Sequence, residues 1–300
     1  MKLYDECRNC LYNSQLKKVT STHGDDPRLP VFKERVRALC DSAPESSCAP
    51  LLMRGIDDIH REIFGGPIDY SNEKRAFNNA LLDMEEAIYA RISAADDPVK
   101  EGIKYAMAAN YIDYARLSGL GGDSIAKVIY AADRAETDDG VYEKFAAALN
   151  GANTIAYLHD NCGEIVLDKL LIRAIKGAYP RINVISIVRG GAVINDVTRL
   201  DAEETGLNKL AYVADNGTNI PGTYLPGVNA LTRAFIKNAD VVIAKGLGNL
   251  ETLYGEVPGA FYMFMCKCEH IAEKFGKKVW DTAFVCDEPT DGAFDGEGAV

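Results

Sequence analysis

The sequence contains few histidines and no long apolar run. Its four histidines stand at positions 23, 60, 159 and 270, and none forms the H-x-x-x-H pair by which a helix holds catalytic zinc. No apolar stretch approaches the roughly 18 residues that span a membrane, and residues 1–6 do not resemble a secretory signal. The G-x-S-x-G turn of serine hydrolases is also absent. We therefore exclude these hydrolase classes and a membrane protein, and we expect a cytoplasmic location.

Basic residues are also fewer than acidic residues in this sequence. The chain has 33 Lys and Arg against 44 Asp and Glu, which gives a formal net charge of −11. No basic run is long enough to follow a phosphate backbone, so neither nucleic acid nor an anionic membrane is expected as a partner. With 47% apolar residues among 300, the composition is that of a globular protein rather than a disordered or fibrous one. A small molecule is the expected partner, and the oligomeric state is left open.

The eight cysteines are too sparse for a disulfide scaffold in a chain of this length. Cys7 and Cys10 have the C-x-x-C spacing, which suits a metal site, a redox pair or plain thiols. A redox pair of the thioredoxin kind needs a preceding strand, whereas the apolar spacing that follows indicates a helix. We favour plain thiols and keep a second, structural metal at Cys7 and Cys10 as the alternative. Its further ligands would come from Cys40, Cys48 or Cys268.

Residues 1–150 are expected to form a helical domain. Apolar residues recur at three- and four-residue spacing over 31–40, 74–92 and 98–117. Asp97 and Pro98 suit the N-cap and first position of the third of these helices. Runs rich in Val and Ile, typical of strands, are missing before about residue 152.

Residues 151–300 alternate between strand and helix patterns and are expected to form the second domain. Short apolar runs typical of buried parallel strands lie at 154–158, 182–188, 209–213, 240–244 and 279–285. Helical patterns lie at 165–178, 202–206, 229–238, 250–254 and 268–275. Residues 261–266 could be a further strand or the start of the last helix. This alternation predicts an α/β fold with a Rossmann-like, doubly wound and mainly parallel sheet that carries the active site.

Ligands of such sheets collect beyond the carboxyl ends of the strands. Asp160 and Asn161 follow the first predicted strand, and Asp196 follows the second. Two carboxylates and an amide oxygen at neighbouring strand ends suit Mg²⁺ or Mn²⁺, with coordination positions left for water and substrate. Alternatively, Asp160 and Asn161 form only a turn that caps the next helix.

The segment Lys245–Asn249, with sequence KGLGN, follows the fourth predicted strand. It places a lysine, a flexible turn and the start of a helix in succession, and such a turn can hold a phosphate. The alternative is a solvated lysine before a glycine turn. Because the metal-type residues and this anion-type turn would share one rim of the sheet, we favour the functional interpretation.

Four ordered motifs resemble those of the damage-control phosphatase family, long catalogued as a domain of unknown function and also called acidic residue methyltransferase-like proteins. They lie at 97–113, 159–164, 193–198 and 240–251. With the C-x-x-C pair near the start, the pattern most resembles the archaeal and bacterial branch, and the likeness spans nearly the whole chain. One departure is Leu247, where family members often have glutamine.

The resemblance implies a helical N-terminal domain beside a Rossmann-like domain. It also implies a divalent-metal-dependent phosphatase that acts on sugar phosphates or damaged phosphometabolites. The implied metal ligands are Asp160, Asn161 and Asp196, with Mg²⁺, Mn²⁺, Co²⁺ or Ni²⁺ as the ion. The implied phosphate clamp is Lys245.

We accordingly name Asp160, Asp196 and Lys245 as the catalytic residues. The sequence leaves open whether Asp160 attacks the phosphoryl group itself or only binds the metal. Asn110 and Asp113, one turn apart on a predicted helix of the first domain, could reach over the site, or could belong to a polar helix stripe. The full set of expected substrate-binding residues is Asn110, Asp113, Asn195, Lys245, Asn249 and Glu251.

Two other functions compete with this one. Methyl transfer from S-adenosylmethionine to a carboxyl group is claimed for some eukaryotic relatives. A methyltransferase, however, needs no metal-ligand triad and usually has a glycine-rich loop after its first strand, which residues 160–163 match poorly. The other alternative is a non-catalytic protein that binds a metabolite or a metal on the same scaffold.

Overall fold

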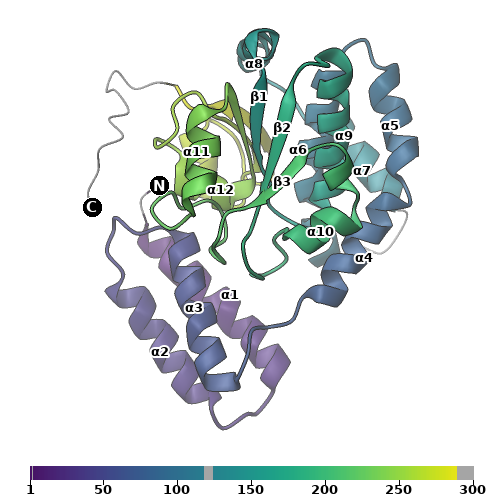
Figure 1. Cartoon of the computed structure of the whole chain (residues 1–300). Coiled ribbons are helices and arrows are strands. Elements are labelled where there is room, and N and C mark those ends of the chain that lie inside the picture. The colour runs from purple at the N-terminus through teal and green to yellow at the C-terminus, as the bar shows by residue number, and fades with distance from the viewer. Residues whose placement is uncertain (2, 118–123, 289–300) are drawn as a thin grey trace.

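The computed structural model describes residue 1, residues 3–117 and residues 124–288, without the side chains of residues 110–128. At its centre is a six-stranded sheet of order β3-β2-β1-β4-β5-β6, which is the order of doubly wound sheets (Figure 1). The first five strands are parallel, and the last is antiparallel to its neighbour. The prediction of an α/β fold with a mainly parallel sheet is confirmed. The strands are β1 (Thr154–Leu158), β2 (Asn183–Val188), β3 (Tyr212–Asp215), β4 (Val241–Lys245), β5 (Phe261–Met265) and β6 (Thr282–Cys286).

Two strand predictions need correction. The run predicted at 209–213 begins too early, because Gly206 turns the chain into a short 3₁₀ helix, η1 (Leu207–Lys209), before β3 starts. The run predicted at 279–285 is antiparallel to β5 rather than parallel. A parallel return needs a crossover of a dozen or more residues that carries the chain to the other end of the sheet. Here the Cys266 amide donates to the Asp281 carbonyl, and the Cys266 carbonyl accepts from the Trp280 amide. The chain therefore returns to the sheet at the same end at which β5 finished.

Three helices at the N-terminus have a hydrophobic core of their own. They are α1 (Asp5–His23), α2 (Leu29–Ser42) and α3 (Ala49–Phe64). Figure 1 shows them in purple as a lobe below the sheet. Phe32, Val36 and Ile56 are among the side chains buried between them. We call these three helices the N-terminal lobe.

The next five helices follow the lobe in the chain, and some of them contact strands of the sheet while the others pack on neighbouring helices. They are α4 (Ser71–Leu82), α5 (Glu85–Ala94), α6 (Pro98–Leu117), α7 (Ser124–Arg134) and α8 (Asp139–Gly151). The single helix predicted at 74–92 is two helices, because the chain tightens at Asp83 and Met84. Asp97 caps α6 as expected, accepting from the amides of Val99 and Lys100. The division into domains at residue 150 stays a prediction, while the buried side chains of α5, α6 and α8 share one core with the sheet.

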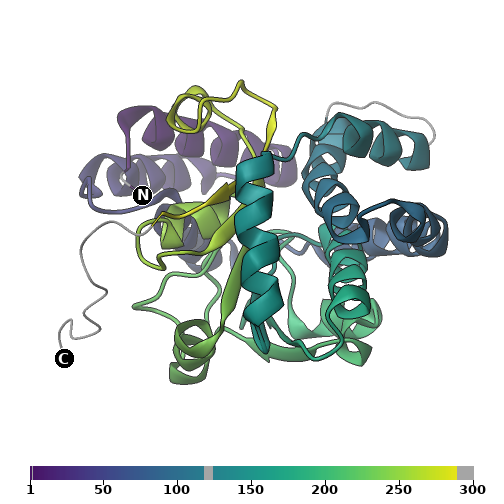
Figure 2. The ribbon, with the colours of Figure 1, turned by 90° about the horizontal axis from the view of Figure 1, so that it is seen from above.

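The sheet lies between two layers of helices, as seen from above in Figure 2. Successive residues of β1 alternate between the two cores, with Ile155 and Tyr157 in one and Ala156 and Leu158 in the other. Among the described helices, none is long and apolar enough to cross a membrane. The remaining helices are α9 (Glu164–Ala178), α10 (Arg199–Glu204), α11 (Ala230–Asn238), α12 (Gly246–Leu253) and α13 (Glu269–Lys274).

Candidate active site

The loops that follow β1 and β2 lie side by side. Asn161 and Asp196 form an isolated antiparallel bridge between the two loops. The Cys162 amide donates to the Asn195 carbonyl at 2.9 Å, and the Val197 amide donates to the Asp160 carbonyl at 2.8 Å. Because β1 and β2 are adjacent parallel strands, their carboxyl ends meet at one edge of the sheet. The structure thus brings together the three residues predicted to bind a metal.

Those three side chains are buried and mutually connected. Asp160 and Asn161 are each 7% exposed, and Asp196 is 3% exposed. The Asn161 amide nitrogen donates to Asp160 Oδ2 at 2.9 Å and to Glu164 Oε1 at 3.0 Å. Asn161 therefore turns its nitrogen toward two carboxylates, which links the residues after β1 to the first turn of α9.

Arg189, directly after β2, was not singled out in the sequence. Its side chain is fully buried, and its Nε donates to Asp196 Oδ2 at 2.6 Å. Its Nη2 lies 3.5 Å from Asp160 Oδ1. The guanidinium therefore joins the two predicted carboxylate ligands, while its Nη1 has no hydrogen-bond partner among the described residues. The signal available in the sequence was that Arg189 lies between Asp160 and Asp196 along the chain, but this spacing matches no known motif.

Lys245 is fully buried at the end of β4. Its ammonium lies 2.6 Å from Asp168 Oδ1 and 3.3 Å from Glu164 Oε2. Its ion-pair partners in the described part of the chain are thus Asp168 and Glu164, neither of which was among the predicted site residues, and its predicted role as a phosphate clamp stays a prediction. Glu164 and Asp168, one turn apart on α9, therefore present their carboxylates to the same ammonium.

Asp168 is the hub of a second polar network. It accepts from the Tyr157 hydroxyl at 2.9 Å, and it lies 3.0 Å from His159 Nδ1. The other ring nitrogen of His159 lies 3.1 Å from Ser186 Oγ. Burial lowers the pKa of His159, which favours the neutral ring. His159 thus links Asp168 on α9 to Ser186 on β2 and helps to hold Asp168 in place.

The buried carboxylates outnumber the buried cations paired with them. Among the described ion pairs, Asp160, Glu164, Asp168 and Asp196 share Arg189 and Lys245, which leaves two surplus negative charges when all four are ionised. Burial is the main cause that raises the pKa of Asp160, which lies well above its usual range, and the charges of Asp196 and Glu164 add to it. Burial also raises the pKa of Asp196 and of Glu164. Their ionised forms call for further positive charge.

The turn after β4 fits closely around this cluster. Gly246 has φ of 75°, and a Cβ placed there would lie 1.9 Å from Asp160 Oδ2. Only glycine allows both the backbone conformation and the close approach. Asn249 is fully buried, and its amide nitrogen donates to the carbonyl oxygens of Lys245, at 2.6 Å, and His159, at 3.1 Å. Asn249 thus fastens α12 to the ends of β4 and β1.

Glu251 lies elsewhere on α12. It lines a small cavity shared with Cys7, Cys48 and Cys268, next to the N-terminal lobe. Burial raises the pKa of Glu251 to about 7. All eight cysteines are free thiols. Among the described residues, no three His, Cys, Asp or Glu side chains are arranged to hold a metal by themselves.

The remaining expected substrate-binding residues are less informative. Asn195 is half-buried, and its carbonyl joins the two strand-end loops. Asn110 and Asp113 belong to α6, and their side chains lie outside the described residues.

Lys267 is a second residue that the sequence analysis missed. It stands two positions beyond the end of β5 and is exposed. Its backbone position is set by Cys266, whose amide and carbonyl are both hydrogen-bonded to the segment before β6. Its charge lowers the pKa values of Asp160 and Glu164. Lys267 therefore carries an exposed positive charge close to the carboxylate cluster.

Three archaeal proteins are similar to this chain. An uncharacterised protein of Methanocaldococcus jannaschii is 26% identical over 296 residues, with 95% of each chain covered. A damage-control phosphatase of Archaeoglobus fulgidus is 26% identical over 297 residues, covering 94% of this chain and 98% of the relative. A damage-control phosphatase of Pyrococcus horikoshii is 32% identical over 188 residues, covering 61% of this chain and 63% of the relative.

The fold is shared with a solved structure. The crystal structure of a DUF89 family protein from Pyrococcus horikoshii matches with a TM-score of 0.83 at 24% identity, covering 96% of this chain and 100% of the other. The family model for the damage-control phosphatase ARMT1-like domain matches residues 4–282. That span includes the N-terminal lobe and every strand-end residue described above. The chain therefore belongs to the ARMT1-like damage-control phosphatase family.

Proposed function

We propose that this protein is a divalent-metal-dependent phosphatase that hydrolyses phosphomonoesters of small metabolites, either sugar phosphates or damaged phosphometabolites. The observation that carries the proposal is the cluster of four buried carboxylates around two buried cations at the carboxyl ends of β1, β2 and β4. Membership of a family whose relatives are named damage-control phosphatases supports the same reaction class. A cytoplasmic location is part of this proposal.

The cluster suits a divalent metal. Asp160, Asn161 and Asp196 would hold it through oxygen atoms, which Mg²⁺, Mn²⁺, Co²⁺ and Ni²⁺ accept as ligands. The two surplus negative charges match the charge of one such ion. When bound, the metal would offset negative charge on the transferring phosphoryl group.

The residues around the cluster hold it in place. Arg189 donates to Asp196 and lies beside Asp160, so it keeps both carboxylates at the edge of the sheet. Lys245 pairs with Glu164, which in turn accepts from the Asn161 amide. We propose that Lys245 contributes to catalysis through this chain of contacts, because its ammonium is enclosed by carboxylates.

A phosphate monoester needs a cation that it can reach. Lys267 is exposed, follows the strand next to β4, and acts electrostatically on Asp160 and Glu164. We propose that Lys267 binds the phosphate from the solvent side. The ammonium would favour the charge that develops on the phosphoryl oxygens during transfer.

The proposal is tested with a panel of phosphate monoesters and metals. Activity should vanish in EDTA and return with one of the four ions. Asp196→Ala should abolish activity while its circular dichroism stays that of a folded protein, because Asp196 lies in a loop between regular elements. Loss of its buried pair with Arg189 should lower the free energy of unfolding without removing a helix or strand. Full activity in chelator would refute the metal dependence, and inactivity against the whole panel would refute the reaction class.

A second, structural metal at Cys7 and Cys10 remains a separate proposal. The thiols of Cys48 and Cys268 line one cavity with Cys7, which places three candidate sulfur ligands together. Elemental analysis of the purified protein tests it. If these thiols hold a metal, zinc or iron should be lost in Cys7→Ser and retained in Asp196→Ala, and protein without thiol-bound metal would rule the site out and leave the plain thiols.

A further inference from the structure

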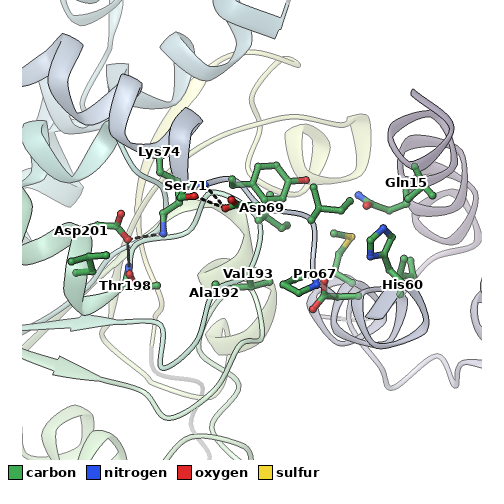
Figure 3. Close-up of a pocket in the computed structure, with 18 of the residues that line it drawn as sticks. Gln15, His60, Pro67, Asp69, Ser71, Lys74, Ala192, Val193, Thr198 and Asp201 are labelled. Atoms are coloured by element: carbon green, nitrogen blue, oxygen red, sulfur yellow. Dashed lines mark hydrogen bonds and ion pairs between the residues drawn. The ribbon is translucent and has the colours of Figure 1, made fainter. Parts of the chain in front are cut away.

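A second cavity lies between the N-terminal lobe and the loop that follows β2 (Figure 3). Its volume is about 280 Å³, close to the lower end of known ligand pockets. Phe32, Met53 and Ile56 line it from the lobe, and Val193 and Ile194 line it from the loop. None of the three proposed metal ligands lines it. It is therefore a separate compartment beside the active site.

Each charged group that lines this cavity has a partner: Asp57 pairs with Arg61, Asp69 accepts from Ser71, and the other four pair with one another. Lys74 lies 2.6 Å from Asp201, which also accepts from the Thr198 hydroxyl, as Figure 3 shows. Arg75 lies 3.3 Å from Glu204. The remaining walls are mostly apolar. A charged ligand would have to compete with these ion pairs and hydrogen bonds, so an uncharged and mainly apolar molecule fits best.

One wall of the cavity is joined directly to the proposed metal site. Ile194 has φ of 44°, a strained conformation that β-branched residues rarely adopt. Ile194 precedes Asn195 and Asp196 in the chain, and the Asp196 amide donates to the Val193 carbonyl at 3.1 Å. A molecule that presses on the side chains of this turn would therefore shift Asp196.

We propose that this cavity binds a small, uncharged, mainly apolar effector, and that its occupancy changes the metal affinity of the active site through the turn at 193–196. Binding of the effector does not depend on the phosphatase proposal. The coupling does rest on it, because it is read out at the proposed metal ligands. By linkage, a metal bound at Asp196 changes the affinity of the effector by the same factor.

The binding step is tested with N-phenyl-1-naphthylamine, an uncharged fluorophore whose emission rises in apolar surroundings. The wild-type protein should bind one equivalent. Met53→Trp fills the cavity from α3 and should weaken binding at least tenfold, whereas Leu51→Trp, on the same helix but not in the lining, should bind as the wild type. Thermal melting checks both folds, and Ala192→Phe fills the cavity from the opposite wall if Met53→Trp does not fold. Lack of binding by the wild type would overturn the proposal.

The coupling step is tested by calorimetric titration of Mn²⁺ with and without the fluorophore. The apparent affinity should change at least threefold in the wild type. Ile194→Gly relaxes the backbone and removes part of the wall, so the change should disappear in that variant. Fluorophore binding with unchanged Mn²⁺ affinity would overturn the coupling. Loss of phosphatase activity against every substrate would leave both measurements valid, so the two proposals can fail separately.

Discussion

Lys245, the last residue of β4, and Lys267, two positions after β5, differ in burial and therefore in what they can bind. Lys245 is enclosed by Asp168 and Glu164, whereas Lys267 is exposed above the same edge of the sheet. A buried ammonium that is already paired stabilises the site but is not available to a ligand. An exposed ammonium near buried carboxylates is free to meet an incoming anion.

Removing the buried lysine should weaken the fold. Lys245→Met leaves two carboxylates without their cation, and loss of one partner of a buried ion pair typically costs about 3 to 5 kcal/mol. Urea unfolding followed by circular dichroism measures this loss. Asp168→Asn in the same chain should restore part of it, because one uncompensated charge is removed. A variant with wild-type stability would contradict the buried pairing.

Removing the exposed lysine should instead affect the reaction with the substrate. Lys267→Met should lower kcat/KM for a phosphate monoester by about 10- to 100-fold, with stability within about 0.5 kcal/mol of the wild type. Lys278→Met is the matched control, since Lys278 is an exposed lysine of the segment between β5 and β6. Equal kinetics for the two variants would remove Lys267 from the mechanism.

At the scale of elements, the turn from β4 to α12 is held by a glycine in contact with the carboxylate cluster. Gly246→Ala would push a methyl group into Asp160, so we expect loss of metal binding and of activity. Gly255, with φ of 88° and open space within 4 Å of the position that a methyl group would take, is the control that isolates the backbone cost. Gly255→Ala should cost about 1 kcal/mol and keep metal affinity. Calorimetric titration with Mn²⁺ separates the two outcomes.

Helix α12 also joins the sheet to the N-terminal lobe, and Glu251 makes that contact sensitive to pH. Its folded pKa of about 7 lies above the ordinary value of 4.5, so the folded state binds the extra proton. Stability from this group is therefore complete below about pH 4.5 and is lost as pH rises toward 7. Glu251→Gln should exceed the wild type in unfolding free energy at pH 8, by an amount on the order of 1 to 3 kcal/mol. The gain should shrink at pH 5, and a gain independent of pH would contradict the raised pKa.

At the scale of the whole molecule, the surplus of buried negative charge should make stability depend on metal. An ion that binds only the folded state adds about 2.7 kcal/mol at a hundred times its Kd. Tm should therefore rise by several degrees on addition of Mn²⁺ and fall back in EDTA. The rise should vanish in Asp196→Ala and persist in Asp215→Ala, which changes a strand-end aspartate outside the cluster. A Tm indifferent to metal in the wild type would count against the site.

Local patterns in the sequence were enough for the fold class and for most elements. The apolar spacing over 98–117 predicted α6, and the apolar run at 154–158 predicted β1, each at its observed bounds. The predicted strand order along the chain also indicated that Asp160, Asn161 and Asp196 lie at one edge of the sheet, where the structure has them. These features follow from short-range periodicity and from the rule that parallel strands end at one edge. Fold class, strand-end residues and family likeness were thus determined by the sequence itself.

Tertiary structure alone decided what each charge at that edge contacts. Lys245 pairs with Asp168, which lies 77 positions earlier, and Arg189 joins two aspartates from different loops. The direction of β6 depended on how its connection closes, and the cavity beside Ile194 exists only because the N-terminal lobe packs against the loop after β2. Spacing along a chain carries no information on such pairings, because burial and charge compensation are settled between segments that meet only in the folded molecule.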